Sequence, residues 1–177
     1  MTTGFDFDFP LEEPERPEAA AIDLAEFKRA VGSFATGVTV VTARNGDRMV
    51  GFTANSFTSV SLDPPLVLLC LDRRAPSLLG FNPGGTFAVN LLGDDQEDLS
   101  RHFARHAEDK FAGIAVRSSA GGLPLLDGCL AAVECTLEHR FYGGDHVILV
   151  GRVVALSVAE EGEPLVFFRS RYRALAP

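Results

Sequence analysis

The sequence has few cysteines, no tryptophan and no long apolar run. Three cysteines without a CxxC pair argue against a disulfide framework and a thiolate zinc site, and they fit a reducing cytoplasm. The longest apolar runs, 65–71 and 147–150, fall well short of the roughly 20 residues that cross a bilayer. The first ten residues carry acids and no basic segment, unlike a secretory signal. We therefore expect a cytoplasmic protein without a membrane span.

Basic residues are also scarce. The chain has 16 Lys and Arg against 24 Asp and Glu, for a net charge of −8 and a pI of about 4.9. A general nucleic-acid binder needs excess positive charge to neutralise phosphates, so the composition disfavours that class. A small anionic ligand is still compatible, because local arginines act inside an acidic protein. The length of 177 residues suits one domain.

The common catalytic and phosphate-binding fingerprints are absent: GxGxxG, GxxxxGK[ST] and GxSxG do not occur. His102 and His106 are four residues apart, but HFARH lacks the glutamate of HExxH, so a solvated or stacking pair is favoured over a metal site. Cys70 and Cys135 fall in apolar strands and are interpreted as small core residues. The chain is therefore either a binding module or a protein whose cofactor carries the reaction.

Periodicity and turn signals predict a chain rich in strands. Residues 1–21 are expected to form a flexible acidic arm, and residues 22–177 the folded domain. The predicted helices cover 24–35, 77–81 and 95–106, and 107–130 is expected to be mostly loop. The predicted strands cover 38–44, 48–53, 66–71, 86–92, 130–141, 146–158 and 164–168, with a hairpin at Asn45 and Gly46. This pattern favours an antiparallel barrel or sandwich with a few short helices over a βαβ nucleotide fold.

Three segments could form a site. Residues 51–61 hold six hydroxyl or amide side chains, which suit either a polar ligand or a capped turn. In 143–146, a histidine follows a glycine turn at the mouth of the last hairpin, where it could also be merely solvated. In 169–173, three arginines surround Tyr172, as in a nucleotide site or in a solvated tail.

Seven segments, in this order and spacing, resemble the short-chain flavin reductase family, whose members supply reduced flavin to two-component flavin monooxygenases. The resemblance runs from about residue 27 to residue 172. The segments are FATGVTVVT at 34–42, GFTANSFTSVSLDPPLVLLCL at 51–71, FAVNLL at 87–92, DKFAGI at 109–114, GCLAAVEC at 128–135, GDHVILVGRV at 144–153 and PLVFFRSRY at 164–172. The resemblance implies a mainly β, antiparallel, Greek-key-like split β-barrel that binds flavin at a homodimer interface.

The resemblance also implies where ligands bind. Ser77 falls where the flavin phosphate is held, and His146 of the GDH motif is associated with the nicotinamide nucleotide as the expected catalytic residue. No metal is expected. The residues expected to contact the flavin are Gly51, Phe52, Thr53, Asn55, Ser56, Cys70, Leu71, Asp72, Ser77, His102, Phe103 and, as a weaker correspondence, Tyr172 and Arg173.

One of these positions carries a charge that needs compensation. Asp72 would place a second anion near the flavin phosphate, which is unfavourable. We expect its carboxylate to face away from the phosphate or toward a ring N–H. Arg73 or Arg74 is expected to supply the compensating positive charge.

The implied function is hydride transfer from NADH or NADPH to FMN or FAD, with the two rings stacked. Reduced flavin would then diffuse to a separate oxygenase. The alternative is a non-catalytic flavin-binding or electron-transfer protein on the same barrel, which would not need His146. A purely structural dimer is disfavoured by the polar segment 53–61. The choice between FMN and FAD, the choice between NADH and NADPH, and the oxygenase served are left open.

Overall fold

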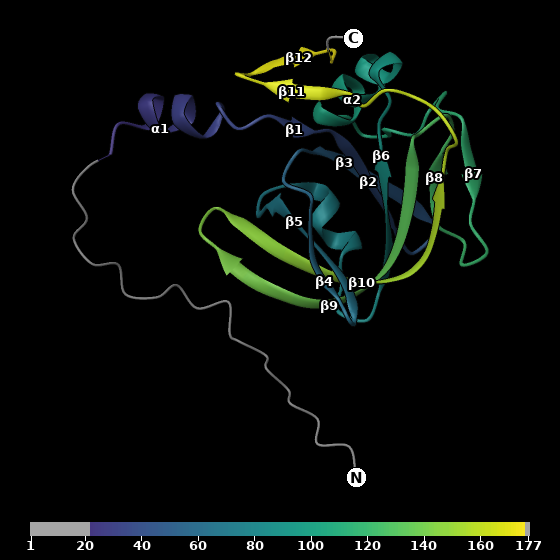
Figure 1. Cartoon of the computed structure of the whole chain (residues 1–177). Coiled ribbons are helices and arrows are strands. Elements are labelled where there is room, and N and C mark those ends of the chain that lie inside the picture. The colour runs from purple at the N-terminus through teal and green to yellow at the C-terminus, as the bar shows by residue number, and fades with distance from the viewer. Residues whose placement is uncertain (1–21, 176–177) are drawn as a thin grey trace.

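A seven-stranded antiparallel sheet organises the molecule (Figure 1). The computed structural model describes residues 22–175, so the acidic arm expected over 1–21 lies outside the described residues. The strand order is β3-β2-β6-β9-β10-β5-β4, and every pairing is antiparallel, which confirms the mainly β prediction. The strands are β2 (Thr39–Asn45), β3 (Arg48–Ala54), β4 (Thr58–Leu62), β5 (Pro65–Asp72), β6 (Thr86–Leu91), β9 (Ala131–Gly143) and β10 (His146–Val158).

Two small sheets flank this one. β7 (Val116–Ser118) pairs with β8 (Pro124–Leu126), inside a segment that was expected to be mostly loop. β1 (Thr36–Gly37) pairs with β11 (Val166–Phe168), which pairs with β12 (Arg171–Arg173) at the top of Figure 1. The strands β4 and β12 also differ from the prediction, which interpreted their segments as part of a polar stretch and of a C-terminal tail.

Two hairpin turns contain residues with positive φ: a glycine in the β2–β3 turn, and an arginine and a serine in the β11–β12 turn. Asn45 pairs with Arg48, so the β2–β3 turn consists of Gly46 and Asp47, one residue later than predicted. Gly46 has φ of 61°, as the first position of a type II′ turn requires. The β11–β12 turn places Arg169 and Ser170 at φ of 48° and 59°, a conformation that side chains other than Asn and Gly rarely adopt.

The two longer helices are shorter than predicted, and the third has the predicted length. α1 (Leu24–Val31) ends at Gly32 rather than continuing to residue 35, because the chain turns there toward β1. It has no buried residue and stands apart from the sheets in Figure 1. The 3-10 helices η1 (Pro76–Gly80) and η2 (Asp94–Gln96) and the helix α2 (Glu97–Ala104) cover the other predicted regions. Among residues 22–175, no helix is long and apolar enough to span a membrane.

The core lies on both faces of β2. Val40 and Val41 are adjacent and therefore point to opposite sides, and both are 0% exposed. Val41 packs in the main cluster with Phe52, Phe87 and other residues of the seven-stranded sheet. Val40 packs in a second cluster below α2, which includes Phe103. This arrangement explains the apolar run in β2 and fixes α2 against the neighbouring strand β3.

Candidate functional site

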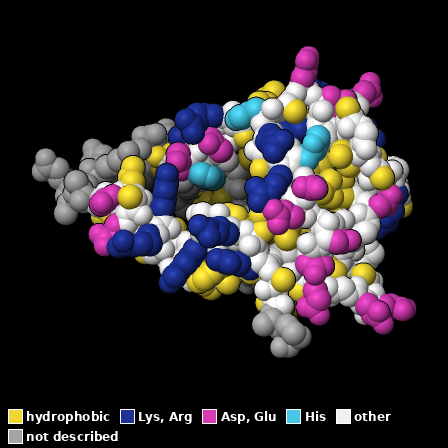
Figure 2. Space-filling model, turned by 90° about the horizontal axis from the view of Figure 1, so that it is seen from above, with side chains coloured by type: hydrophobic (Ala, Val, Ile, Leu, Met, Phe, Trp, Pro, Cys, Tyr) yellow, Lys and Arg dark blue, Asp and Glu magenta, His cyan; other side chains and the backbone are white. Residues whose placement is uncertain are grey.

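A cavity of about 1020 Å³ runs along β3, one of the two edge strands of the seven-stranded sheet. Its other walls are the end of β5, the helix η1, the C-terminal end of α2 with the loop 104–110, and the start of β10. Viewed from above, Lys, Arg and His side chains with several acids between them surround a hollow in the surface (Figure 2). The predicted site residues that line the cavity are Gly51, Phe52, Thr53, Asn55, Ser56, Cys70, Leu71, Asp72, Ser77, Phe103 and His146.

Three predicted contact residues do not line this cavity, and two of them, His102 and Tyr172, instead contact elements that form its walls. The ring nitrogen Nε2 of His102 lies 2.8 Å from the carbonyl oxygen of Lys110, which fastens the loop after α2. The Tyr172 hydroxyl lies 2.8 Å from Ser100 Oγ on α2. Arg173 is exposed at the end of β12. Within the single chain, these side chains therefore reach a ligand only through other residues.

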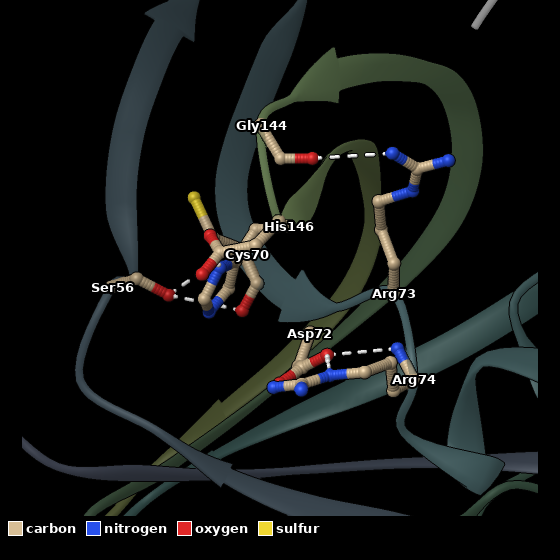
Figure 3. A network of polar contacts seen from close by, with 8 residues as sticks. Ser56, Cys70, Asp72, Arg73, Arg74, Gly144 and His146 are labelled. Carbon is tan, nitrogen blue, oxygen red and sulfur yellow. Dashed lines mark hydrogen bonds and ion pairs between the residues drawn. The ribbon is translucent and has the colours of Figure 1, made fainter.

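The polar segment 51–61, which begins inside β3, uses most of its hydroxyl groups in hydrogen bonds within the protein. Thr53 Oγ1 donates to the carbonyl oxygen of Ser100 at 2.6 Å, which ties β3 to α2. Ser56 Oγ accepts from the Cys70 amide at 2.9 Å and donates to the Cys70 carbonyl at 3.3 Å, so it takes the place of a neighbouring strand (Figure 3). Asn55 is exposed, and its amide makes no hydrogen bond to another described residue. Asn55 is therefore the member of this segment best able to bind a ligand directly.

The two cysteines that were expected in the core differ. Cys135 is buried in the main cluster, and burial raises the pKa of its thiol to about 12. Cys70 is half-buried and lines the cavity instead, because alternate residues of β5 face the core and the cavity. Partial burial also raises the pKa of Cys70. Its thiol is therefore protonated near neutral pH and contributes an uncharged, polarisable surface.

An arginine compensates the charge of Asp72, as the sequence analysis expects. Arg74 Nη2 lies 3.0 Å from Asp72 Oδ2, and the Arg74 amide donates to Oδ1 at 2.8 Å (Figure 3). These hydrogen bonds lower the pKa of Asp72 from 3.8 to about 2. The partner is thus Arg74, whereas Arg73 donates to the carbonyl oxygen of Gly144 at 3.3 Å. The pair leaves this corner of the cavity close to neutral.

His146 stands at the first position of β10, opposite Asp72 of β5. Its ring nitrogen Nδ1 lies 2.7 Å from Asp145 Oδ1. The hydrogen bond from the imidazole lowers the pKa of Asp145, so the carboxylate stays charged. A carboxylate at Nδ1 favours the tautomer with the proton on that nitrogen. Nε2 is then available to accept a hydrogen bond from a ligand.

Ser77 and Lys110 complete the walls. Ser77 is 8% exposed on η1, and its hydroxyl makes no hydrogen bond to another described residue. Lys110 was not predicted, although its segment DKFAGI was noted, because nothing in the sequence shows where its side chain ends. Its Nζ donates to the carbonyl oxygens of Phe103 at 2.8 Å and Gly51 at 3.2 Å. Within 22–175, no three His, Cys, Asp or Glu side chains cluster to hold a metal ion.

Comparison with known proteins places these features in context. The sequence model of the protein family described as flavin reductase like domain matches residues 31–176. The chain is 45% identical over 156 residues to the actinorhodin polyketide dimerase of Streptomyces coelicolor, which covers 88% of each chain. It is 44% identical over 149 residues to the reductase component of the 4-hydroxyphenylacetate 3-monooxygenase of Thermus thermophilus, covering 84% of this chain and 95% of that one. The structure of the Streptomyces globisporus NADH:FAD oxidoreductase SgcE6 with NAD and FAD fragments aligns with a TM-score of 0.83 at 40% identity, covering 90% of this chain and 98% of that one.

Proposed function

The chain belongs to the flavin reductase-like family, and we propose from this premise how its cavity performs the family's reaction. It is an NAD(P)H-dependent flavin reductase, an oxidoreductase that transfers a hydride from the reduced nicotinamide to FMN or FAD. Its reduced flavin is supplied to a separate monooxygenase component. The structural observation that supports the assignment most strongly is that the segment 51–56, the end of β5, Ser77 and His146 all line one cavity.

The residues of the cavity fit a flavin. The volume accommodates a three-ring system, and the lining combines apolar side chains with neutral hydrogen-bonding groups. Asn55 and Ser77 both line the cavity and have polar groups that no other described residue satisfies. We assign Asn55 to the polar edge of the ring system or its ribityl chain, and Ser77 to the phosphate.

The side chains of this protein bind and orient rather than react. When bound, the flavin supplies the acceptor atom N5 for the hydride. His146 positions the nicotinamide nucleotide, and Asp145 holds the imidazole in one tautomer. Phe103, which is 0% exposed and lines the cavity, contributes an apolar wall that excludes water. Aligning the two ring systems supplies most of the rate enhancement, so no nucleophilic side chain is needed.

We propose that two copies of the chain form a split β-barrel homodimer with flavin at their interface. Val154, Leu156 and Val158 on β10 are 58%, 65% and 71% exposed, and the apolar side chains of α1 are exposed as well. Exposed apolar surface of this kind is typical of a contact with another protein. We further propose that residues 22–177 form the single catalytic domain, that 1–21 lie outside it, and that the enzyme works in the cytoplasm.

The reaction is tested by mixing the purified protein with NADH or NADPH and free FMN or FAD under air. Loss of the reduced nicotinamide absorbance band only when flavin is present supports the reductase and gives both preferences. If neither nicotinamide is consumed although added flavin binds, the protein is a flavin carrier, and the role of His146 is wrong.

The role of His146 is tested separately. We expect His146→Ala to raise the KM for NAD(P)H about tenfold, since it removes a hydrogen bond to a charged ligand, and to leave flavin affinity nearly unchanged. His139→Ala is the matched control, because His139 is exposed on β9 and does not line the cavity. An equal loss of flavin binding in His146→Ala would contradict the assignment.

A further inference from the structure

Lys110 places a cation in the wall of the cavity without a carboxylate partner. Its Nζ donates to the Phe103 and Gly51 carbonyl oxygens, and no ion pair joins it to an acid among residues 22–175. An ammonium group has three N–H donors, so two are used within the protein and one is available to the cavity that Lys110 lines. In contrast, the charge of Arg74 on the other wall is balanced by Asp72.

The fold holds this ammonium firmly. Phe103 lies in the last turn of α2, where carbonyl oxygens carry the negative end of the helix dipole and attract a cation. The Gly51 carbonyl belongs to the edge strand β3. Partial burial lowers the pKa of Lys110, which shows that its charge is poorly solvated. A poorly solvated cation gains more from an incoming anion than an exposed one does.

Lys110 and Ser77 lie on opposite sides of β3. A Cβ at Gly80 of η1 would lie 2.4 Å from the Val50 side chain, whereas a Cβ at Gly51 would lie 2.9 Å from the Phe103 ring. Val50 and Gly51 are adjacent and point to opposite faces of the strand, so η1 and α2 pack on opposite faces. This separation is compatible with a flavin that has its phosphate at Ser77 and its ring system on the side of Lys110.

We propose that Lys110 binds the negative charge that the flavin ring gains on reduction. This inference rests on the proposed function. A hydride carries two electrons and one proton; the neutral reduced nicotinamide leaves as a cation, and the neutral flavin ring becomes an anion. Lys110 therefore interacts more strongly with the reduced flavin than with the oxidised one. It favours hydride transfer and holds the product until release.

The test measures two dissociation constants for each variant, one for oxidised flavin and one for pre-reduced flavin without oxygen. We expect Lys110→Met to weaken the binding of reduced FMN about tenfold or more, and that of oxidised FMN about threefold or less. Lys110→Arg should restore the preference. The chain has one other lysine, Lys28, which is exposed on α1, so Lys28→Met is the matched control. The proposal is overturned if the ratio of the two dissociation constants is unchanged in Lys110→Met. If both constants rise by the same factor, Lys110 only fastens α2 to β3.

Riboflavin separates the ring from the phosphate. Lys110→Met should reduce the preference for the reduced form by the same factor with riboflavin as with FMN. If the effect of the substitution disappears with riboflavin, Lys110 binds the phosphate and the proposal is wrong. If wild-type protein neither binds oxidised flavin nor consumes NAD(P)H, the proposed function itself fails, which is a different outcome from normal binding with an unchanged ratio.

A second measurement uses only the wild-type protein, in case Lys110→Met does not fold. Acetylation of the two lysines is followed by mass spectrometry, with Lys28 as the internal reference. Reduced flavin should protect Lys110 more strongly than oxidised flavin at equal saturation, and neither should protect Lys28. Equal protection of Lys110 by both forms would contradict the proposal.

Discussion

The two ends of β10 are both rich in apolar residues, but their surroundings differ. From His146 to Arg152, the strand pairs with β9 on one side and β5 on the other, and Val147, Leu149 and Val150 are buried. From Val153 to Val158 it pairs only with β9, and Val154, Leu156 and Val158 are exposed. The register shift between Val153 and Ala155 marks the change.

The difference shows that apolar sequence alone does not decide burial, which also depends on what packs against the strand. Where β10 has two neighbours, its first residue stands at the cavity. Where it has one, the same residue types form a surface that the proposed second copy would cover.

The largest expected effect is the loss of stability from a substitution in the buried half of β10. A Cβ at Gly151 would lie 2.4 Å from Phe87 Cζ, so Gly151→Ala forces the Phe87 ring to move and should cost about 3 kcal/mol of unfolding free energy. Gly37→Ala is the control, because no atom lies within 4 Å of its added Cβ. Urea unfolding compares the two. Similar midpoints would mean that the core around Phe87 is loosely packed.

Breaking the exposed end should leave the fold intact and dissociate the dimer. Leu156→Asp places a charge in the proposed contact and should weaken self-association by about 2 kcal/mol, or roughly thirtyfold. Ser157→Asp is the control, since the adjacent residue points to the other face of the strand. Sedimentation equilibrium measures both. Dissociation in the Ser157 variant alone, or in neither, would place the contact elsewhere.

A smaller effect should sharpen the description of the cavity end. Asp145→Asn keeps a side chain that can bond His146 but removes its charge, so the KM for NAD(P)H should rise about threefold. Asp47→Asn, in the exposed β2–β3 turn, is the control. Steady-state kinetics at fixed flavin separate the two. A KM for flavin that rises equally would show that the Asp145–His146 pair serves both ligands.

The smallest effect concerns acid stability at the same end. The pKa of Asp72 is lowered from 3.8 to about 2 by Arg74, so the pair stabilises the fold above about pH 4, and this contribution is lost as the pH falls toward 2. Arg74→Met should therefore be less stable than wild type at neutral pH, with a difference that shrinks through this window. Thermal unfolding at several pH values measures it. A difference that is independent of pH would mean that Arg74 acts through packing.

The strands with strong periodicity were predictable, and those defined by distant partners were not. The alternation in β9 and β10 and the glycine turn between them gave both strands from local signals. The β11–β12 hairpin was missed because Arg169 and Ser170 adopt positive φ, which their residue types do not indicate.

The site follows the same division. The resemblance grouped residues that do line one cavity, and the charge argument at Asp72 identified Arg74 as a candidate partner. Tyr172 was placed beside the ligand, whereas its hydroxyl bonds Ser100. Lys110 was overlooked. Both outcomes depend on contacts between segments far apart in the chain, and single-sequence patterns do not contain them.

The contact between Gly51 and the Phe103 ring makes these two positions interdependent in evolution. The missing side chain at 51 is what lets α2 approach β3 so closely. Alanine at 51 should be harmful beside phenylalanine but tolerated beside a smaller residue, and the double substitution should cost less than the sum of the single ones. Related sequences should therefore exchange these two residues together, and the pair can be used to adjust the width of the cavity in engineered variants.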